Sequence, residues 1–360
     1  MKPSKKGSNS ATVRSSIYGT TSTGEVIDIY SCTNENGLVL KMITYGATVV
    51  SLEVPNSDMQ ISNIALCYNN FDDYLVGQSY FGSTIGRYCN RINNAQFNLN
   101  EKKYTLAAND NSNHLHGGEQ GFDKVIWDAS PIIDIEGVGI KFQYRSIDGE
   151  ECYPGNLDVT AIYKLTNRNE LKIVFSAMSD KPTPVNLTNH NYWNLGGVDS
   201  GDILDHELFI NAKKYLAINN SLIPTGDLLD VKDTPFDFSS SRRIRERMNL
   251  IPQIESLPNG YDHCFILENN HGDFKTAAIV KDPRSGRSME IFTTQPSIQF
   301  YSGNFLNGSN NCGGYRQHDG FCLETQHYPD SPNQPEFPTT ILIPGEKYYH
   351  ETIHRFYNEY

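Results

Sequence analysis

Basic residues are few in this 360-residue chain: 30 Lys and Arg stand against 42 Asp and Glu, a formal net charge of −12. Nucleic acids and anionic membranes bind proteins through clustered Lys and Arg, so this balance argues against both as partners. The one basic cluster, 242–247, contains Glu246 and is typical of an exposed helix face. We therefore expect no nucleic-acid or membrane binding.

Cysteine occurs only seven times, an odd number, and no two cysteines show the C-x-x-C spacing. This distribution indicates neither a disulfide framework nor a zinc ribbon, and it favours a reducing compartment. Long apolar runs are missing as well, and none follows the basic N-terminal residues as it would in a secretory signal. The sequence thus predicts a soluble, cytoplasmic protein.

Helical periodicity is scarce, and the best candidate for a helix is 240–250, opened by serines and closed before Pro252. Elsewhere apolar and polar residues alternate, which indicates half-buried β-strands. The clearest alternating segments are 50–54, 138–145, 157–165 and 173–177. The turn pairs expected to connect such strands are Asn36-Gly37, Asp148-Gly149, Asn259-Gly260 and Asp319-Gly320. The pattern predicts an all-β fold, a large twisted antiparallel β-sandwich with few short helices.

Length alone would allow two domains, but large all-β folds often exceed the average domain size as one unit. A hydrophobic fraction of 38 % with 28 glycines is ordinary for a globular protein and allows a sizeable core. No repeat or low-complexity linker divides the chain. We expect a disordered tail over 1–12, a single domain over 13–360, and a monomer.

The segment 184–197 contains one imidazole, four asparagines, a phenol and an indole within fourteen residues. Core strands rarely hold so many amides, because each buried amide must find several partners. Asn189, Asn191 and Asn194 are not all expected to be satisfied by backbone, which favours a ligand or water nearby. Aromatic rings beside amides and His190 suit a sugar, which has hydroxyls at its rim and C–H bonds on its faces.

Glu324 is the acid that could work with His190, and it ends the apolar run Gly320-Phe-Cys-Leu. Its simplest interpretation is a strand-end carboxylate paired with an arginine. Burial among apolar and amide neighbours would instead raise its pKa and make it a useful general base. The sequence leaves both interpretations open.

Six short sequence motifs occur along the chain. They are the segments around His190 and Glu324 and the segments 81–92, 115–118, 261–263 and 299–305. Together they resemble the motifs of the galactose mutarotases (aldose 1-epimerases), over nearly the whole chain from about Ser16. The chain departs from that pattern at Trp193, where the family often has Phe, and at Cys89, where a small residue is common. Neither departure removes a polar group from the expected site.

The resemblance implies the β-supersandwich of mutarotases and an isomerase that interconverts the α and β anomers of free hexoses such as galactose and glucose. It implies Glu324 as the base and protonated His190 as the acid, with no cofactor and no metal. It further implies that the sugar hydroxyls are bound by Asn90, Arg91, His116, Tyr192, Asp262 and Gln299.

His350-Glu351-Thr-Ile-His354 matches the H-E-x-x-H pattern of zinc peptidases. That pattern requires a helix, in which residues four apart share a face. Here the alternation after a Pro-Gly turn indicates a strand, in which the two histidines lie about 13 Å apart at about 3.3 Å per residue. We therefore expect no zinc site there.

Two other functions remain open. A glycosidase would use Asp262 and Glu324 as its carboxylate pair, which leaves His190 without a role. A non-catalytic sugar-binding protein would keep the cleft without the chemistry, but both His190 and Glu324 are present.

Overall fold

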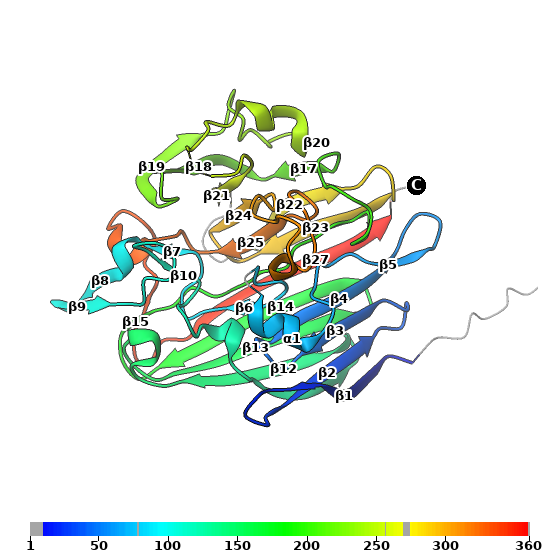
Figure 1. The fold of residues 1–360 in the computed structure, drawn as a ribbon, viewed down its shortest axis with the longest axis horizontal. Coiled ribbons are helices and arrows are strands. Elements are labelled where there is room, and N and C mark those ends of the chain that lie inside the picture. Colours follow the sequence, from blue (N-terminus) through cyan, green and yellow to red (C-terminus); the bar gives the residue numbers. More distant parts are fainter. Residues whose placement is uncertain (1–9, 78, 256, 269–273, 359–360) are drawn as a thin grey trace, which may run out of the picture.

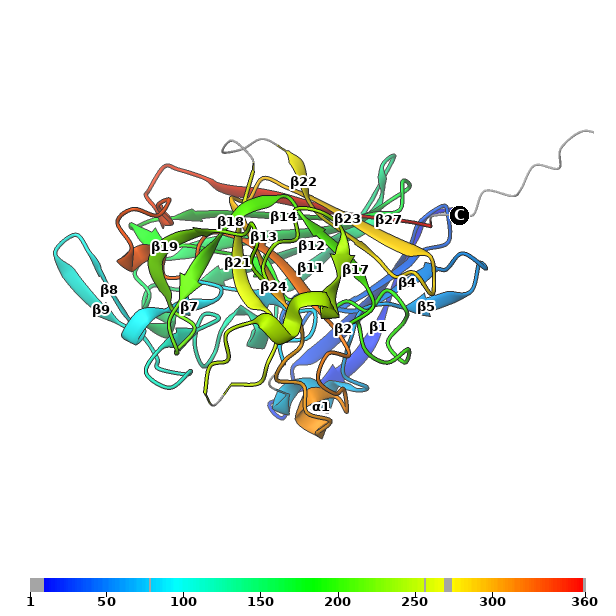
Figure 2. The same ribbon diagram turned by 90° about the horizontal axis from the view of Figure 1, so that it is seen from above.

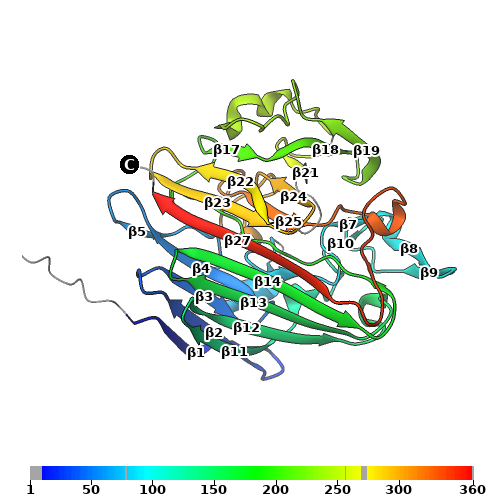
Figure 3. The same ribbon diagram turned by 180° about the vertical axis from the view of Figure 1, so that it is seen from behind.

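The computed structural model describes residues 10–77, 79–255, 257–268 and 274–358, and their secondary structure is mostly β (Figure 1). The largest sheet has nine strands, all paired antiparallel, in the order β11-β12-β13-β14-β27-β23-β22-β17-β20. In that order their bounds are Asp128–Asp134, Gly137–Ser146, Leu157–Thr166, Glu170–Ser179, Tyr348–Asn358, Arg287–Thr293, Lys275–Lys281, Glu207–Ile210 and Arg242–Arg243. Seen from behind, this sheet faces the viewer, with β27 across its middle (Figure 3).

Two five-stranded antiparallel sheets complete the main architecture. The first follows chain order, with β1 Thr12–Thr20, β2 Val26–Thr33, β3 Val39–Ile43, β4 Thr48–Pro55 and β5 Ile61–Asn63. The second runs β19 Pro224–Asp230, β18 Ala212–Ile218, β21 Asp262–Leu267, β24 Ser297–Tyr301 and β25 Cys322–Gln326. One buried apolar cluster draws side chains from all three sheets, which makes the fold the predicted all-β sandwich.

Four short strand pairs connect these sheets. They are β6 Thr84–Ile85 with β16 Thr188–Asn189, β7 Arg91–Ile92 with β10 His114–Leu115, β8 Gln96–Leu99 with β9 Lys102–Thr105, and β15 Thr183–Pro184 with β26 Ile341–Leu342. The one α-helix of the described residues is α1, Phe71–Val76, which lies at the lower edge in Figure 2. The 3₁₀ turns are Asn93–Ala95, Phe122–Lys124, Glu150–Cys152, Ile244–Leu250, Asn310–Cys312 and Ser331–Asn333.

The alternating segments form strands as predicted, and β13 shows why. Its residues Leu157, Val159, Ala161, Tyr163 and Leu165 are all buried, while the residues between them are more exposed. Successive side chains of a strand point to opposite faces, so one face of β13 packs into the core. The segments at 50–54, 138–145 and 173–177 lie within β4, β12 and β14.

The predicted helix over 240–250 is wrong. Arg242–Arg243 forms β20, which pairs with β17, and only a 3₁₀ turn follows over Ile244–Leu250. The backbone N–H of Ile244 donates to the carbonyl of His206 and that of Arg245 to the carbonyl of Leu204, so this segment is tied to the residues that precede β17. Tertiary hydrogen bonds thus override a local pattern that is compatible with a helix.

Two of the four expected hairpin turns are confirmed, since Asn36-Gly37 joins β2 to β3 and Asp148-Gly149 lies between β12 and β13. Asn259-Gly260 and Asp319-Gly320 instead end longer irregular segments that precede β21 and β25.

Of the predicted tail 1–12, residues 1–9 lie outside the described residues, and β1 begins at Thr12. No helix among the described residues is long and apolar enough to cross a membrane.

Candidate active site

A cavity of about 420 Å³ brings together side chains that are far apart in the sequence. Its walls come from β25, β21, the β7–β10 pair and the segment after β16, and the β7–β10 pair lies beside the sheet that contains β25 (Figures 1 and 3). Seven of the eight residues singled out in the sequence line it: Asn90, Arg91, His116, His190, Tyr192, Asp262 and Glu324. Gln299 is not among the lining residues.

Glu324 and His190 meet at the wall of this cavity. Glu324 is in the middle of β25 and only 3 % exposed, and its Oε1 lies 3.8 Å from Nε2 of His190. The other carboxylate oxygen, Oε2, has no hydrogen-bond partner among the described residues. A buried carboxylate oxygen without a partner is costly, and such costs are found where a ligand is to be bound or a proton moved.

The His190 ring is held by backbone and by aromatic neighbours. The backbone N–H of His190 donates to the carbonyl of Ser83, which fixes the main chain, and the ring stacks against Tyr192 at 5.0 Å and against Tyr80 at 5.7 Å between centroids. Tyr80 also lies edge-on to His116 and lines the cavity. Sequence reasoning missed Tyr80, although it directly precedes one of the six motifs.

Burial shifts the pKa values of the pair in opposite directions. Desolvation raises the pKa of Glu324 well above its ordinary value, with a further rise from the charge of Asp262 and a reduction from Arg91. Desolvation lowers the pKa of His190 to about 4. Both shifts favour the uncharged forms of the two side chains.

Asn90 and His116 are fixed to each other. The backbone N–H of His116 donates to the carbonyl of Asn90, and the N–H of Asn90 donates to Nδ1 of His116. Both residues have the left-handed backbone conformation, with φ of 59° and 51°. Because Nδ1 accepts a hydrogen bond, the proton of the neutral His116 ring is on Nε2, which makes His116 a donor. Strained backbone of this kind often occurs at ligand sites.

Arg91 and Asp262 complete the charged part of the wall. Nε of Arg91 donates to Asp110 at 2.7 Å, which leaves the terminal guanidinium nitrogens for other partners. Asp262 Oδ1 accepts a hydrogen bond from Nε2 of Gln299 at 2.6 Å. Gln299 lies directly opposite Glu324 on the neighbouring strand, and its side chain positions Asp262 through this hydrogen bond.

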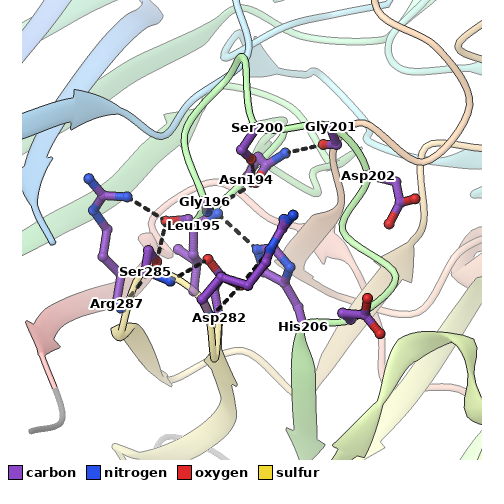
Figure 4. A network of polar contacts seen from close by, with 12 residues as sticks. Asn194, Leu195, Gly196, Ser200, Gly201, Asp202, His206, Asp282, Ser285 and Arg287 are labelled. Carbon is purple, nitrogen blue, oxygen red and sulfur yellow. Dashed lines mark hydrogen bonds and ion pairs between the residues drawn. The ribbon is translucent and has the colours of Figure 1, made fainter. Parts of the chain in front are cut away.

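The amides of segment 184–197 divide into structural and unsatisfied ones. Asn194 donates to the carbonyls of Gly201 and Asp319 and accepts from Ser200, and so anchors the loop after the site (Figure 4). Asn191 has no partner at either side-chain atom among the described residues, but it lines a separate small cavity beside His354. The expectation that the backbone does not satisfy all of these amides is therefore confirmed by Asn191.

Comparison with known proteins agrees with this site. The family model described as aldose 1-epimerase matches residues 28–355.

The chain belongs to the aldose 1-epimerase family.

Curated members of the aldose 1-epimerase family are similar over most of the chain. The galactose mutarotase of Homo sapiens is 42 % identical over 323 residues, which cover 89 % of this chain and 91 % of that protein. The aldose 1-epimerase of Escherichia coli K12 is 37 % identical over 340 residues, or 93 % and 97 % of the two chains. A crystal structure of galactose 1-epimerase from Lactobacillus acidophilus superposes with a TM-score of 0.87 at 29 % identity, covering 98 % of this chain and all of that one.

The two departures from the aldose 1-epimerase pattern lie away from the cavity wall. Trp193 is buried against His354 and Phe356 of β27. Cys89 is buried with its Sγ 3.4 Å from Oε1 of Gln326. Neither residue lines the cavity, so the polar groups of the site are those of the family pattern.

The H-E-x-x-H string lies in β27, as its alternation predicted. Across the sheet, His350 pairs with Phe175 and His354 with Leu171, so the two histidines occupy separate positions along the strand. Glu351 binds Lys172 at 2.8 Å. The arrangement expected of a zinc peptidase helix is not formed by this string.

Proposed function

We propose that this protein interconverts the α and β anomers of free hexoses, with Glu324 as the base and His190 as the acid. The observation that carries the proposal is the buried pair itself, Glu324 Oε1 and His190 Nε2 at 3.8 Å, at the wall of a cavity of about 420 Å³. A cavity of this size accommodates a monosaccharide with its water. Membership of the aldose 1-epimerase family supports the same reaction class.

The reaction needs one proton removed from the C1 hydroxyl and one delivered to the ring oxygen. The ring then opens to an aldehyde, C1 rotates about its bond to C2, and closure on the other face gives the second anomer. Glu324 takes the hydroxyl proton and His190 protonates the ring oxygen, and the two exchange these roles on closure. A well-placed acid or base contributes about 10²–10⁴-fold each.

The pair can supply both groups because it holds one proton. We propose that this proton resides on Glu324 before sugar binds, because burial favours the uncharged forms of both side chains, and that the 3.8 Å separation lets it pass to His190 once sugar hydroxyls surround the pair. The working state, carboxylate and imidazolium, has the same proton count as the resting state. No further acid or base is required.

The remaining polar groups of the wall hold the sugar. Arg91 and His116 present N–H donors, and Asp262 presents an acceptor whose position Gln299 fixes. Asn90 adds an amide, and the Tyr192 ring beside His190 offers an apolar face for C–H bonds. We assign Gln299 to support of Asp262, not to direct contact with the sugar.

The substrate class is a free monosaccharide, and we propose galactose and glucose because curated relatives are named galactose mutarotase.

We also propose a single domain over 13–360 that acts as a monomer in the cytoplasm, where its seven free cysteines stay reduced. No cofactor or metal is needed for this chemistry, because the protein supplies both proton-transfer groups.

Polarimetry of freshly dissolved α-D-galactose tests the proposal. We expect the protein to speed the drift of optical rotation, and to release no sugar from an aryl galactoside. Release of the aryl group would favour a glycosidase based on Asp262 and Glu324. Binding of galactose without any acceleration would favour the non-catalytic sugar-binding protein.

A further inference from the structure

His190, Cys322 and Glu324 form a cluster of three different metal-ligand types. One ligand atom from each residue lies within 4.8 Å of the others, and all three residues are buried. Cys322 and Glu324 are two residues apart on β25, so their side chains project from the same face of the strand toward His190. The acid–base chemistry uses His190 and Glu324 but gives no role to the Cys322 thiol.

One of the distances in this cluster matches that of a tetrahedral zinc site. Zn–S and Zn–N bonds of about 2.3 and 2.0 Å place sulfur and nitrogen about 3.5 Å apart. Here Cys322 Sγ lies 3.6 Å from Nδ1 of His190, and Glu324 Oε1 lies 3.8 Å from Nε2. The ring presents a different nitrogen to each partner, so the ring or the carboxylate must shift for one nitrogen to share an ion with both partners.

Two further features point to a ligand. Oε2 of Glu324 is buried and has no hydrogen-bond partner among the described residues, so it is available to a cation. His190 and Glu324 line the cavity, whereas Cys322 lies behind it. Accessible zinc sites share this arrangement: three protein side chains bind the ion, and its fourth coordination position is open to a cavity.

We propose that a thiophilic divalent cation such as Zn²⁺ binds His190, Cys322 and Glu324 and inhibits the protein by occupying its acid–base pair. Thiolate and imidazole ligands select Zn²⁺, Co²⁺ or Cd²⁺ over Mg²⁺ and Ca²⁺, which prefer oxygen ligands. The inhibitory consequence rests on the proposed function, whereas the binding does not.

Binding should strengthen as the pH rises. The metal requires the Cys322 thiolate, a neutral imidazole and the Glu324 carboxylate, so protons are released when it binds. Each proton released makes the affinity about tenfold higher per pH unit over the range where it titrates.

Cobalt absorption tests the binding without any measurement of activity. Co²⁺ added to the wild type at pH 8 should give a sulfur-to-cobalt charge-transfer band and the visible bands of tetrahedral cobalt. Cys322→Ser should lose the charge-transfer band. Cys312→Ser is the matched control, because Cys312 is also a buried cysteine at the cavity but lies outside the cluster, and it should keep the band.

Absence of the band in the wild type, or the same band in Cys322→Ser, would overturn the proposal. Circular dichroism of each variant confirms that it is folded. If cobalt binds as expected but the protein does not speed mutarotation, the proposed function fails and the metal site stands.

Inhibition is measured on the same three proteins. Zn²⁺ should slow mutarotation competitively with sugar, and excess chelator should restore the rate. Relative to its own metal-free rate, Cys322→Ser should need at least about tenfold more Zn²⁺ for half inhibition, while Cys312→Ser should match the wild type. Equal sensitivity of all three proteins would place the inhibiting ion elsewhere and contradict the proposal.

Discussion

Two regions of this molecule place histidine near glutamate, and they do so in opposite ways. In β27, His350, Glu351 and His354 are neighbours in the sequence, but the extended backbone separates them in space. At the cavity, His190 and Glu324 are remote in the sequence, yet their side chains approach to 3.8 Å. A short motif has chemical meaning only in the backbone conformation for which it is known.

The surroundings of the two regions differ as well. Nδ1 of His350 lies 3.2 Å from the hydroxyl of Thr294, and Glu351 is neutralised by Lys172. Glu324 has no cation at salt-bridge distance other than the titratable His190, and one of its oxygens has no partner among the described residues. The exception in β27 is His354, whose buried Nδ1 has no hydrogen-bond partner among the described residues. What distinguishes Glu324 is that its unpaired oxygen belongs to a titratable group at the wall of the large cavity.

Replacing Glu324 should have the largest effect on the cavity region. Glu324→Gln keeps the shape of the side chain but removes its basicity, so catalysed mutarotation should be abolished with little change in sugar affinity or fold. Polarimetry gives the rate, calorimetry the affinity, and circular dichroism the fold. More than a few per cent of residual activity would refute the assignment of Glu324 as the base.

Replacing His190 should come next. His190→Asn should lower kcat by several orders of magnitude while KM changes little, because the transferred proton matters mainly in the transition state. Steady-state kinetics over a range of galactose concentrations separates the two constants. An increase in KM alone would show that His190 only binds sugar, and His116 would then be the first candidate for the acid.

The pH dependence of kcat/KM tests how many protons the Glu324–His190 pair holds in the active enzyme. We expect kcat/KM to be bell-shaped, because the active free enzyme has one proton on the pair. As pH falls through about 4, His190 gains a second proton and activity is lost. As pH rises through the elevated pKa of Glu324, the shared proton is lost and activity falls again. The limbs describe the coupled pair; a profile without an acid limb near pH 4, or without an alkaline limb, would contradict this assignment.

Changes to the β27 string should have the smallest effect. His350→Gln and Glu351→Gln should each leave the mutarotation rate within about twofold of wild type, because neither residue lines the cavity. EDTA should lower neither the activity nor the melting temperature of protein prepared without added metal. A stoichiometric zinc that survives dialysis against chelator, and is lost in His350→Gln, would show that β27 binds metal after all.

Local patterns predicted the strands well because alternation is a property of adjacent residues. The order of strands was not predictable in this way: β27, the last strand, lies between β14 and β23 in the middle of the largest sheet. Such pairing depends on contacts between distant segments. The helix α1 was missed because its six residues, capped by the side chain of Asn70, are too few to show helical periodicity.

The sequence identified the chemical groups of the site better than their positions. His190, Glu324 and five others line one cavity, but Gln299 supports Asp262 from behind it. Tyr80 went unnoticed because an isolated tyrosine before a glycine-containing string has no distinctive local signal. The protonation of the pair was also beyond sequence analysis, since the pKa of His190 depends on how completely the fold buries it.

A double-variant cycle on the rate of α-D-galactose mutarotation tests most directly whether Glu324 and His190 act as one unit. Residues of one proton-transfer unit are strongly non-additive. We therefore predict that Glu324→Gln combined with His190→Asn is no slower, within about threefold, than the slower of the two single variants. If the losses of the single variants multiply in the double variant, the two residues act independently and the shared-proton pair is contradicted.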